Sequence, residues 1–541
     1  MGREVNIDSI LALDGRIKEI TAELIRLKRS RNSLLNIARV PPEILGYIFH
    51  LNAAPEFDDD HFPSIPGGSY NFLLVCHHWF RVARKTPELW SFWGNNLEDW
   101  KRRHPLSGPS SPVDLVLDGI RYEAGSFDEA LRDVLRDRAA RDVIRKVHII
   151  PPYTDPSTAT TIISLLTPED EGIRHSSIES IALNSVDVSN FFARHHFPKL
   201  RDLYLFDNFK ISSWDHLKLH TMALVNLTLT FDDVTPPAVI PTTSQVLSLL
   251  TSNPNIRSLV LQQLVISDNG RNSSTSLVSL CHLERLVFTG DFHHVFPILC
   301  RLELPERMDD AILHFYDCKF VDARVTIGSY IRDYFQRDPR FKDRLVVFSF
   351  SGTSCFSFHA CTSRVEHDST RELPLLYPPH VKFEVELSEG LSLEEQEGLF
   401  IDTLALVPQE NIICLEANLT VAETEHVLAK MPNIEYLHLS NTIIRDGFLL
   451  PSSGVTIPHQ KLLPSLRWLC LEDVQAEDED WDPLITYLIH QTAGNQAVSL
   501  GVEGVDVHVC SDVLDQIYGL VNEFVYFPDP DVACPSNRCL T

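Results

Sequence analysis

The segment from Val40 to Trp93 constrains the fold of this 541-residue chain more than any other segment. Its apolar residues recur at helical spacing in three short stretches. An irregular insert at residues 53–70, which holds three prolines and a pair of glycines, separates the first stretch from the second. Large apolar side chains are so frequent here that a unit of this size cannot bury all of them by itself. The sequence therefore predicts three amphipathic helices that need a partner surface.

The ends of these helices carry recognisable start signals. Pro41 and Pro42 suit the start of the first helix, and Glu43 lies in its first turn, where the helix dipole favours an acid. Thr86 is expected to cap the third helix, with Pro87 at its first position. The apolar residues of each helix are expected to form one face. These faces comprise Ile44, Leu45, Ile48, Phe49 and Leu51; then Phe72, Val75, Cys76, Trp79, Val82 and Ala83; then Leu89, Trp90 and Trp93.

Residues 7–37 form a predicted helix with the apolar seam of a coiled coil. The seam positions alternate at spacings of three and four, which is the heptad spacing. Two arrangements are open: a coiled-coil dimer, or a helix whose seam packs on the neighbouring three-helix unit. Arg31 at a seam position weakens a simple dimer. The seam consists of Ile10, Leu13, Ile17, Ile20, Leu24, Leu27, Arg31 and Leu34.

From residue 113 onward, short L-x-x-L-x-L units recur, and Leu200, Leu203 and Leu205 form the clearest one. Such spacing is typical of leucine-rich repeats, in which one strand and one return segment per repeat bury their leucines against the neighbouring repeats. The pattern blurs at about 290–430, where runs at 345–350 and 381–387 still look like strands. We therefore expect an irregular α/β solenoid, although an ordinary α/β domain can also produce regularly spaced leucines.

These observations divide the chain into four predicted parts, within the α/β class. A coiled-coil-like helix (7–37) precedes the helical domain (38–100). A linker rich in proline and serine (101–112) then leads into the solenoid (113–541).

The sequence contains none of the motifs that would predict catalysis or a bound cofactor. A phosphate-binding loop, a dinucleotide-binding glycine pattern, a zinc-protease helix and a nucleophile elbow are all absent. Adjacent histidine pairs such as His195 and His196 point apart on regular elements and do not predict a metal site. The net charge of −27 disfavours general binding to nucleic acid or anionic membranes. Eleven scattered cysteines and no signal peptide or membrane span favour the cytoplasm or the nucleus.

The order and spacing of the motifs from Val40 to Trp90 resemble the F-box, which docks onto the Skp adaptor of cullin–RING ubiquitin ligases. The F-box pattern L-P-x-E-[IL]-L, [IL]-[FL], V-C-x-x-W and P-x-L-W matches about one tenth of this chain. Val40 replaces the usual leucine, and the insert 53–70 is long enough to reshape part of the docking edge. The whole arrangement is also similar to the large F-box-like families of mushroom-forming fungi. By this resemblance, the residues that hold the helices together or meet the adaptor are Pro41, Ile44, Leu45, Ile48, Val75, Cys76, Trp79 and Trp90.

The resemblance implies a substrate-receptor subunit of an SCF-type (Skp–cullin–F-box) ubiquitin ligase, with no catalytic activity or cofactor of its own. The repeats would bind a protein substrate, and the residues between the inward leucines would face it. Two alternatives are a leucine-rich scaffold that assembles complexes without degradation and an enzyme with an unrecognised site. Within the predicted substrate face, the aromatic candidates are Tyr204, Phe206, Tyr436 and Trp468; the other members are Asp202, Asn226, Thr228, Ser258, Gln262, Arg285 and His438.

Overall fold

Helices and a mostly parallel set of strands make up the described part of the protein, which is an α/β fold. The structure is a computed structural model, and its residues divide into two compact units, Met1–Asn226 and Leu227–Thr541. Most of the predicted insert and most of the blurred region lie outside the described residues. The structure describes residues 7–53, 56–57, 63–64, 71–93, 106–108, 110–118, 135–150, 156–166, 174–184, 187–206, 209, 211, 213–217, 223–231, 240–267, 277–305, 308–319, 346–350, 355–360, 381–387, 409, 412–417, 428, 431–440, 463–472, 481–493, 498–503 and 511–527.

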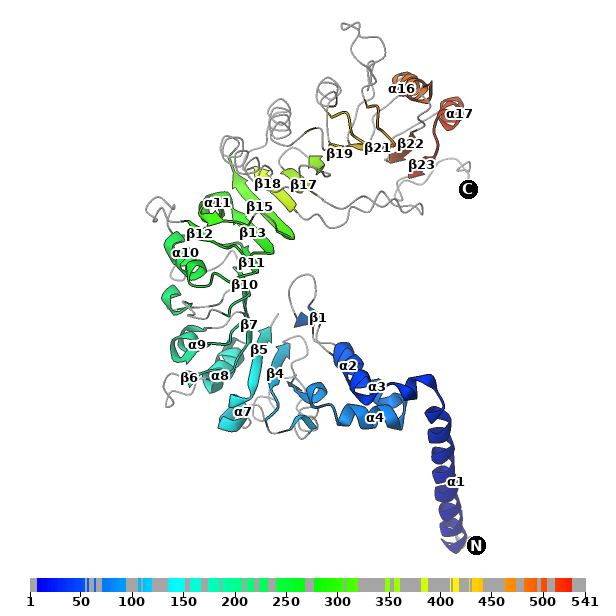
Figure 1. Ribbon diagram of the computed structural model, residues 1–541, viewed down its shortest axis with the longest axis vertical. Helices are drawn as coiled ribbons and strands as arrows, with labels where there is room; N and C mark the ends of the chain where they lie inside the picture. Colours follow the sequence, from blue (N-terminus) through cyan, green and yellow to red (C-terminus); the bar gives the residue numbers. More distant parts are fainter. Residues whose placement is uncertain are drawn as a thin grey trace, which may run out of the picture. The chain divides into compact units, whose positions relative to one another are not determined.

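The first unit begins with helices. The long helix α1 (Ile7–Ser33) is continuous (Figure 1) and is followed by the short 3-10 helix η1 (Asn36–Arg39). The helical unit comprises α2 (Pro42–Ala53), α3 (Phe72–Val75), α4 (His77–Arg84) and the 3-10 helix η2 (Pro87–Trp90). A two-stranded antiparallel pair, β1 (Glu56–Phe57) and β2 (Pro63–Ser64), lies within the insert.

Two helix boundaries differ from the sequence predictions. The predicted second helix is interrupted at Cys76, whose extended backbone (φ −163°, ψ 167°) separates α3 from α4. The third helix is a single 3-10 turn, and the Thr86 side chain does not cap it. The Thr86 hydroxyl instead donates to the carbonyl of Val82 at 3.0 Å. Thr86 therefore closes the end of α4 and does not cap η2.

A parallel ladder follows the helices, and it begins before the predicted linker. Strand β3 (Phe92–Trp93) pairs in parallel with β4 (Val113–Asp118), which continues to β5 (Ile144–Ile150), β7 (Ser180–Asn184) and β9 (Asp202–Phe206). Helices α7 (Arg138–Asp142), α8 (Pro156–Leu166) and α9 (Ser189–Arg194) lie on one side of these strands (Figure 1). Because β3 directly follows η2, the helical unit is continuous with the edge of the ladder.

The register of this ladder explains the leucine spacing. Leu115, Val147, Ile181 and Leu203 are register partners on the four neighbouring strands, and all are buried. In a strand, alternate residues face opposite sides, so the residues between these apolar positions lie on the other face. The strand predicted from Leu200, Leu203 and Leu205 is confirmed as β9.

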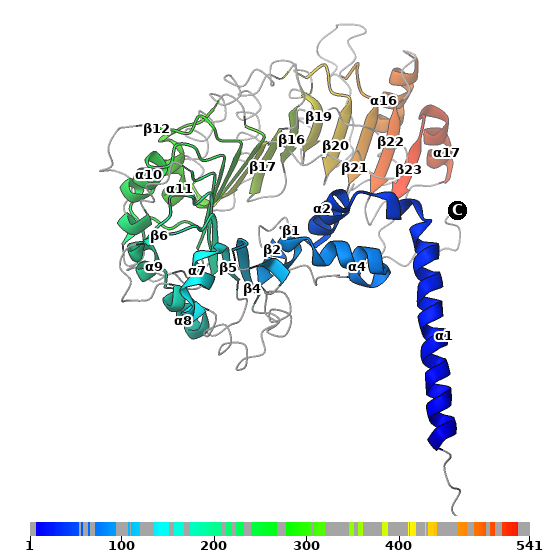
Figure 2. The ribbon, with the colours of Figure 1, turned by 60° about the horizontal axis from the view of Figure 1, so that its bottom comes forward.

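The second unit contains two parallel runs. In the first, β11 (Ser258–Gln262), β13 (Arg285–Asp291), β15 (Asp310–Cys318) and β18 (Val381–Leu387) pair in sequence. In the second run, β16 (Val346–Phe350) pairs with β19 (Ile412–Ala417), and the strands β20 to β23 follow. Their bounds are Tyr436–Ser440, Trp468–Glu472, Ser499–Glu503 and Phe524–Phe527. Figure 2 shows β19 to β23 side by side, with α16 (Asp482–Ala493) and α17 (Ser511–Leu520) beside them.

An antiparallel strand accounts for part of the blurred repeat. Strand β17 (Cys355–Ala360) pairs antiparallel with both β16 and β18, between the two parallel runs. The predicted strand runs at 345–350 and 381–387 correspond to β16 and β18. The regular alternation of strand and return segment is thus replaced here by a reversal of strand direction. The remaining elements are β6 (Arg174–His175), β8 (His195–His196), η5 (Trp214–Leu217), β10 (Asn226–Thr230), α10 (Thr243–Thr251), β12 (Val278–Ser279), α11 (Phe292–Leu299) and β14 (Leu302–Glu303).

The first ladder contains a buried histidine that makes stability depend on pH. His148 Nε2 and Ser180 Oγ lie 2.9 Å apart, and both side chains are buried. Burial lowers the pKa of His148 to about 4. The charge of Lys146 makes a smaller contribution in the same direction, and the charge of Asp114 opposes the shift. As the pH falls, His148 is protonated in the unfolded chain, where its pKa is about 6.5, before it is protonated in the folded chain. The contribution to stability is therefore complete above about pH 6.5 and is lost as the pH falls towards about 4.

We predict that replacing His148 with glutamine flattens the pH dependence of unfolding between about pH 6.5 and 4. Over this window the free energy of unfolding should fall by up to about 3 kcal/mol more in the wild-type chain than in His148→Gln. Urea unfolding followed at several pH values measures the difference. Parallel curves for the two proteins would contradict the buried neutral histidine.

Candidate functional site

The helical unit has its own small core, built mainly from aromatic side chains. Phe49 of α2 stacks on Phe72 of α3, with ring centroids 4.6 Å apart and planes 9° from parallel. Trp79 of α4 lies against the same Phe49 ring at 5.1 Å. Leu45, Val82, Ala83, Leu89 and Trp90 complete the buried cluster.

Trp90 joins the last turn of the unit to this core. Its indole Nε1 donates a 2.7 Å hydrogen bond to the carbonyl of Ala83, and the side chain is buried. Gly46 allows α2 to approach the same region, because a Cβ at this position would lie 2.8 Å from Oγ1 of Thr86. A glycine inside a helix lowers helix propensity, and here the close approach explains its presence.

The same helices also expose large apolar side chains. Four belong to α2, two to α3 and one to α4, and their exposed fractions range from 39 to 85%. We call this set the helical-unit surface. Scattered apolar residues are normal on protein surfaces, whereas a group on adjoining short helices is typical of an interaction site. The set comprises Ile44, Tyr47, Ile48, Leu51, Leu74, Val75 and Phe80.

The residues predicted to serve docking or cohesion divide between core and surface. Leu45 and Trp90 are buried, and Trp79 and Cys76 are half-buried. The exposed members are Pro41, Ile44, Ile48 and Val75.

Only one part of the broad apolar face expected of the first helix is buried, and the other part is exposed. Leu45 and Phe49 point into the core, whereas Ile44, Ile48 and Leu51 are exposed. Sequence reasoning left Tyr47, Leu74 and Phe80 out of the docking set. The spacing of Ile44, Tyr47 and Leu51, three and four residues apart, is a helical signal that could have added Tyr47 to the exposed residues of α2.

The aromatic residues of the predicted substrate face mostly pack onto the sheet. Tyr204 is half-buried, and its ring lies parallel to that of the buried Phe206, with centroids 6.3 Å apart. In the second unit, Tyr436 and Trp468 are buried in a cluster with Cys414 and Cys470. A Cβ on Gly501 would lie 3.4 Å from the Trp468 ring, which is ordinary van der Waals contact, so the indole lies directly beside this glycine. The other predicted members are half-buried, except Thr228, which is buried.

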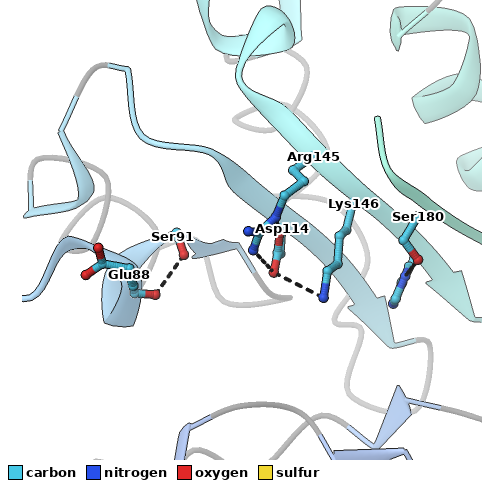
Figure 3. Close-up of polar contacts among 7 residues, drawn as sticks. Glu88, Ser91, Asp114, Arg145, Lys146 and Ser180 are labelled. Carbon is cyan, nitrogen blue, oxygen red and sulfur yellow. Dashed lines mark hydrogen bonds and ion pairs between the residues drawn. The ribbon is translucent and has the colours of Figure 1, made fainter. Parts of the chain in front are cut away.

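A row of charged and polar residues occupies the strand beginnings of the first unit (Figure 3). Arg145 forms two 3.0 Å hydrogen bonds with the carboxylate of Asp114, and Lys146 Nζ lies 3.7 Å from the same carboxylate. Asn226 donates to Asp202 at 2.6 Å. Burial raises the pKa of Asp202, and the Asn226 hydrogen bond opposes that shift. These groups are satisfied by one another, as partly buried polar groups generally are.

The same row connects to the helical unit. The backbone N–H of Asp114 donates to the carbonyl of Ser91 at 2.8 Å, beside the β3–β4 pairing. The Ser91 hydroxyl donates to the carbonyl of Glu88 at 2.7 Å (Figure 3). The end of η2 is therefore held to the first strands by hydrogen bonds.

Two observations on the described residues concern metal and catalytic chemistry. Among them, no group of three or more His, Cys, Asp or Glu side chains is arranged to hold a metal ion. Ser180 and His148 form a serine–histidine pair, but both are buried within the ladder, so a substrate would not reach them. Within the same described residues, no helix is long and apolar enough to cross a membrane.

Comparison with the descriptions of known protein families finds no match for this chain, and comparison with curated proteins finds none either.

The division between core and surface predicts stability effects of very different size for two substitutions in the helical unit. Trp90→Ala removes a buried indole and its hydrogen bond, so it should destabilise the unit by about 3–5 kcal/mol. Ile48→Glu changes an exposed side chain and should shift stability by less than about 0.5 kcal/mol. Limited proteolysis and chemical unfolding of the full chain measure both effects. Equal losses of stability would show that Ile48 belongs to the core.

Proposed function

We propose that the protein is the substrate-recognition subunit of an SCF-type ubiquitin ligase. The helical unit would dock the Skp-type adaptor as an F-box does, and the adaptor would connect the chain to the cullin complex. The observation that carries this proposal is the helical-unit surface, seven large apolar side chains exposed beside a complete small core. A unit that has already filled its core gains nothing from these residues unless a partner covers them.

Two further observations support docking through this surface. The exposed set includes Ile44, Ile48 and Val75, which the F-box resemblance had assigned to docking or cohesion. The stacked rings of Phe49 and Phe72 hold α2 and α3, which carry these residues, against each other. A preformed surface loses little conformational freedom on binding, which favours affinity.

The parallel ladders are the proposed platform for the substrate. We interpret them as irregular leucine-rich repeats that form a solenoid, in which each strand buries leucines and turns its other face towards a ligand. Tyr204 is the aromatic candidate that keeps part of its ring exposed. Because Phe206, Tyr436 and Trp468 are buried, we assign them to support of the sheet surface.

The proposed mechanism is proximity, without catalysis by this chain. A receptor that holds the adaptor and the substrate together raises the effective concentration of the substrate at the ligase. The β3–β4 pairing and the Ser91–Asp114 hydrogen bond would keep docking unit and first ladder together. We place this activity in the cytoplasm or the nucleus.

The proposal predicts that Ile48→Glu weakens binding of a purified Skp-type adaptor to the full chain by at least about tenfold, because a charge replaces buried apolar contact. Ile489→Glu is the matched control: Ile489 lies on α16 and is 49% exposed, against 46% for Ile48. Isothermal titration calorimetry measures both affinities.

Two outcomes would contradict the proposal. One is the absence of adaptor binding by the folded wild-type chain, which would favour the alternative of a scaffold without degradation. The other is an equal loss of affinity in the two glutamate variants, which would indicate non-specific apolar contact.

A further inference from the structure

The helix α1 carries an apolar seam that is open along its whole described length. Its six apolar seam residues within the regular helix are 47–62% exposed. Every described side chain from Ile10 to Arg31 is exposed, on all sides of the helix. The arrangement in which this seam packs on the three-helix unit is therefore absent from the part of the chain that the structure describes. The seam residues are Ile10, Leu13, Ile17, Ile20, Leu24 and Leu27.

The seam has the periodicity of a coiled coil and not that of an ordinary amphipathic helix. Its alternating steps of three and four residues assign Ile10, Ile17 and Leu24 to position a of the heptad. Leu13, Ile20 and Leu27 then take position d. A seam of two apolar positions per heptad is narrow, so it fits one facing helix of the same periodicity.

The side chains at the seam favour two parallel strands. β-branched residues at position a together with leucine at position d are typical of parallel two-stranded coiled coils. Four of the six seam residues follow this rule, with Ile10 and Ile17 at a and Leu13 and Leu27 at d; Ile20 at d and Leu24 at a depart from it. Arg31, at the last a position, is long enough to turn its guanidinium out of a two-stranded seam towards water. A polar residue at one a position restricts register and oligomeric state at some cost in stability.

The charges beside the seam fit a second copy of the same helix. In a parallel pair, position g of one helix faces position e of the next heptad in the other. These positions place Glu23 of each copy opposite Lys28 of the other, which gives two attractive pairs. The remaining g–e pairs, Ser9–Asp14 and Arg16–Thr21, contain no like charges. In the single chain, Glu23 forms a 2.7 Å ion pair with Arg26. Because this pair is exposed, Glu23 can leave it for Lys28 of the second copy with little loss of free energy.

We propose that α1 pairs with α1 of a second copy as a parallel, two-stranded coiled coil, so that the protein is a homodimer. The regular helix of 27 residues is about 40 Å long and supplies between three and four heptads, near the lower limit for an independent coiled coil. The dimer is therefore expected to be reversible. This inference is independent of the adaptor proposal, because α1 shares no residue with the helical-unit surface.

Leu24 and Ile25 offer a matched pair of substitutions for the test. They are neighbours with similar exposure, 49% and 44%, but only Leu24 lies in the seam. In the full chain, Leu24→Glu should weaken dimerisation about a hundredfold, because it removes an apolar layer and places two acids face to face. Ile25→Glu should leave the dimer intact. Sedimentation equilibrium over a range of concentrations measures the association, and circular dichroism checks that both variants stay folded.

The charge assignment and the orientation have separate tests. Glu23→Lys should weaken the dimer, and adding Lys28→Glu to it should restore the association. Leu13→Cys should form a disulfide between two copies under mild oxidation, because a parallel seam brings the two positions 13 together, whereas the wild-type chain should not cross-link there. A wild-type chain that stays monomeric at high concentration, or equal effects of the glutamates at 24 and 25, would overturn the proposal. Association without the cross-link at position 13 would overturn the parallel arrangement.

Discussion

The packing of Trp90 is the interaction on which the arrangement of the first unit depends. Its indole fills the core between α2 and α4 and bonds to the carbonyl of Ala83. The next residue, Ser91, accepts the backbone N–H of Asp114, and the residue after that begins β3. One short segment therefore completes the helical core and starts the parallel ladder. Loss of packing at Trp90 would therefore destabilise both the helical core and the start of the ladder.

This connection gives the apolar side chains of the helical unit their two roles. The core is already filled by stacked aromatic rings, so Ile44, Ile48 and Val75 remain outside it. Exposing such residues to water is unfavourable, and covering them with a partner is favourable. The exposed seam of α1 follows the same physical logic on a single helix. In our account the two surfaces serve different partners, an adaptor and a second copy.

Much of the fold could be predicted from the sequence, because the relevant signals are periodic. Apolar residues at the L-x-x-L-x-L spacing indicated strands such as β5, β7 and β9, and the structure confirms these strands. The pairing of β3 could not be predicted, since two residues carry no periodic pattern and their partner strand begins at Val113. The break at Cys76 was also hidden, because the apolar spacing continues across it. The spacing of apolar residues indicates which face of a helix they share, but it does not show where the helix is interrupted.

The candidate sites were harder to predict than the fold. Ile44 and Leu45 are adjacent and equally apolar, and only the direction from which Phe72 and Trp90 approach decides which is buried. The aromatic substrate-face candidates depended on their neighbours in space. Trp468 lies beside Gly501, which is on the adjoining strand. Sequence distance between positions 468 and 501 gave no sign of that contact.

The central claim is that α2, α3 and α4 form the surface that binds a Skp-type adaptor. Hydrogen–deuterium exchange of the full chain, with and without the purified adaptor, tests it most directly. The account predicts slower exchange on adaptor binding in residues 42–53 and 72–84, with the strands β19 to β23 unchanged. Protection confined to the strands, or no protection at all by an adaptor that is present in excess, would contradict it.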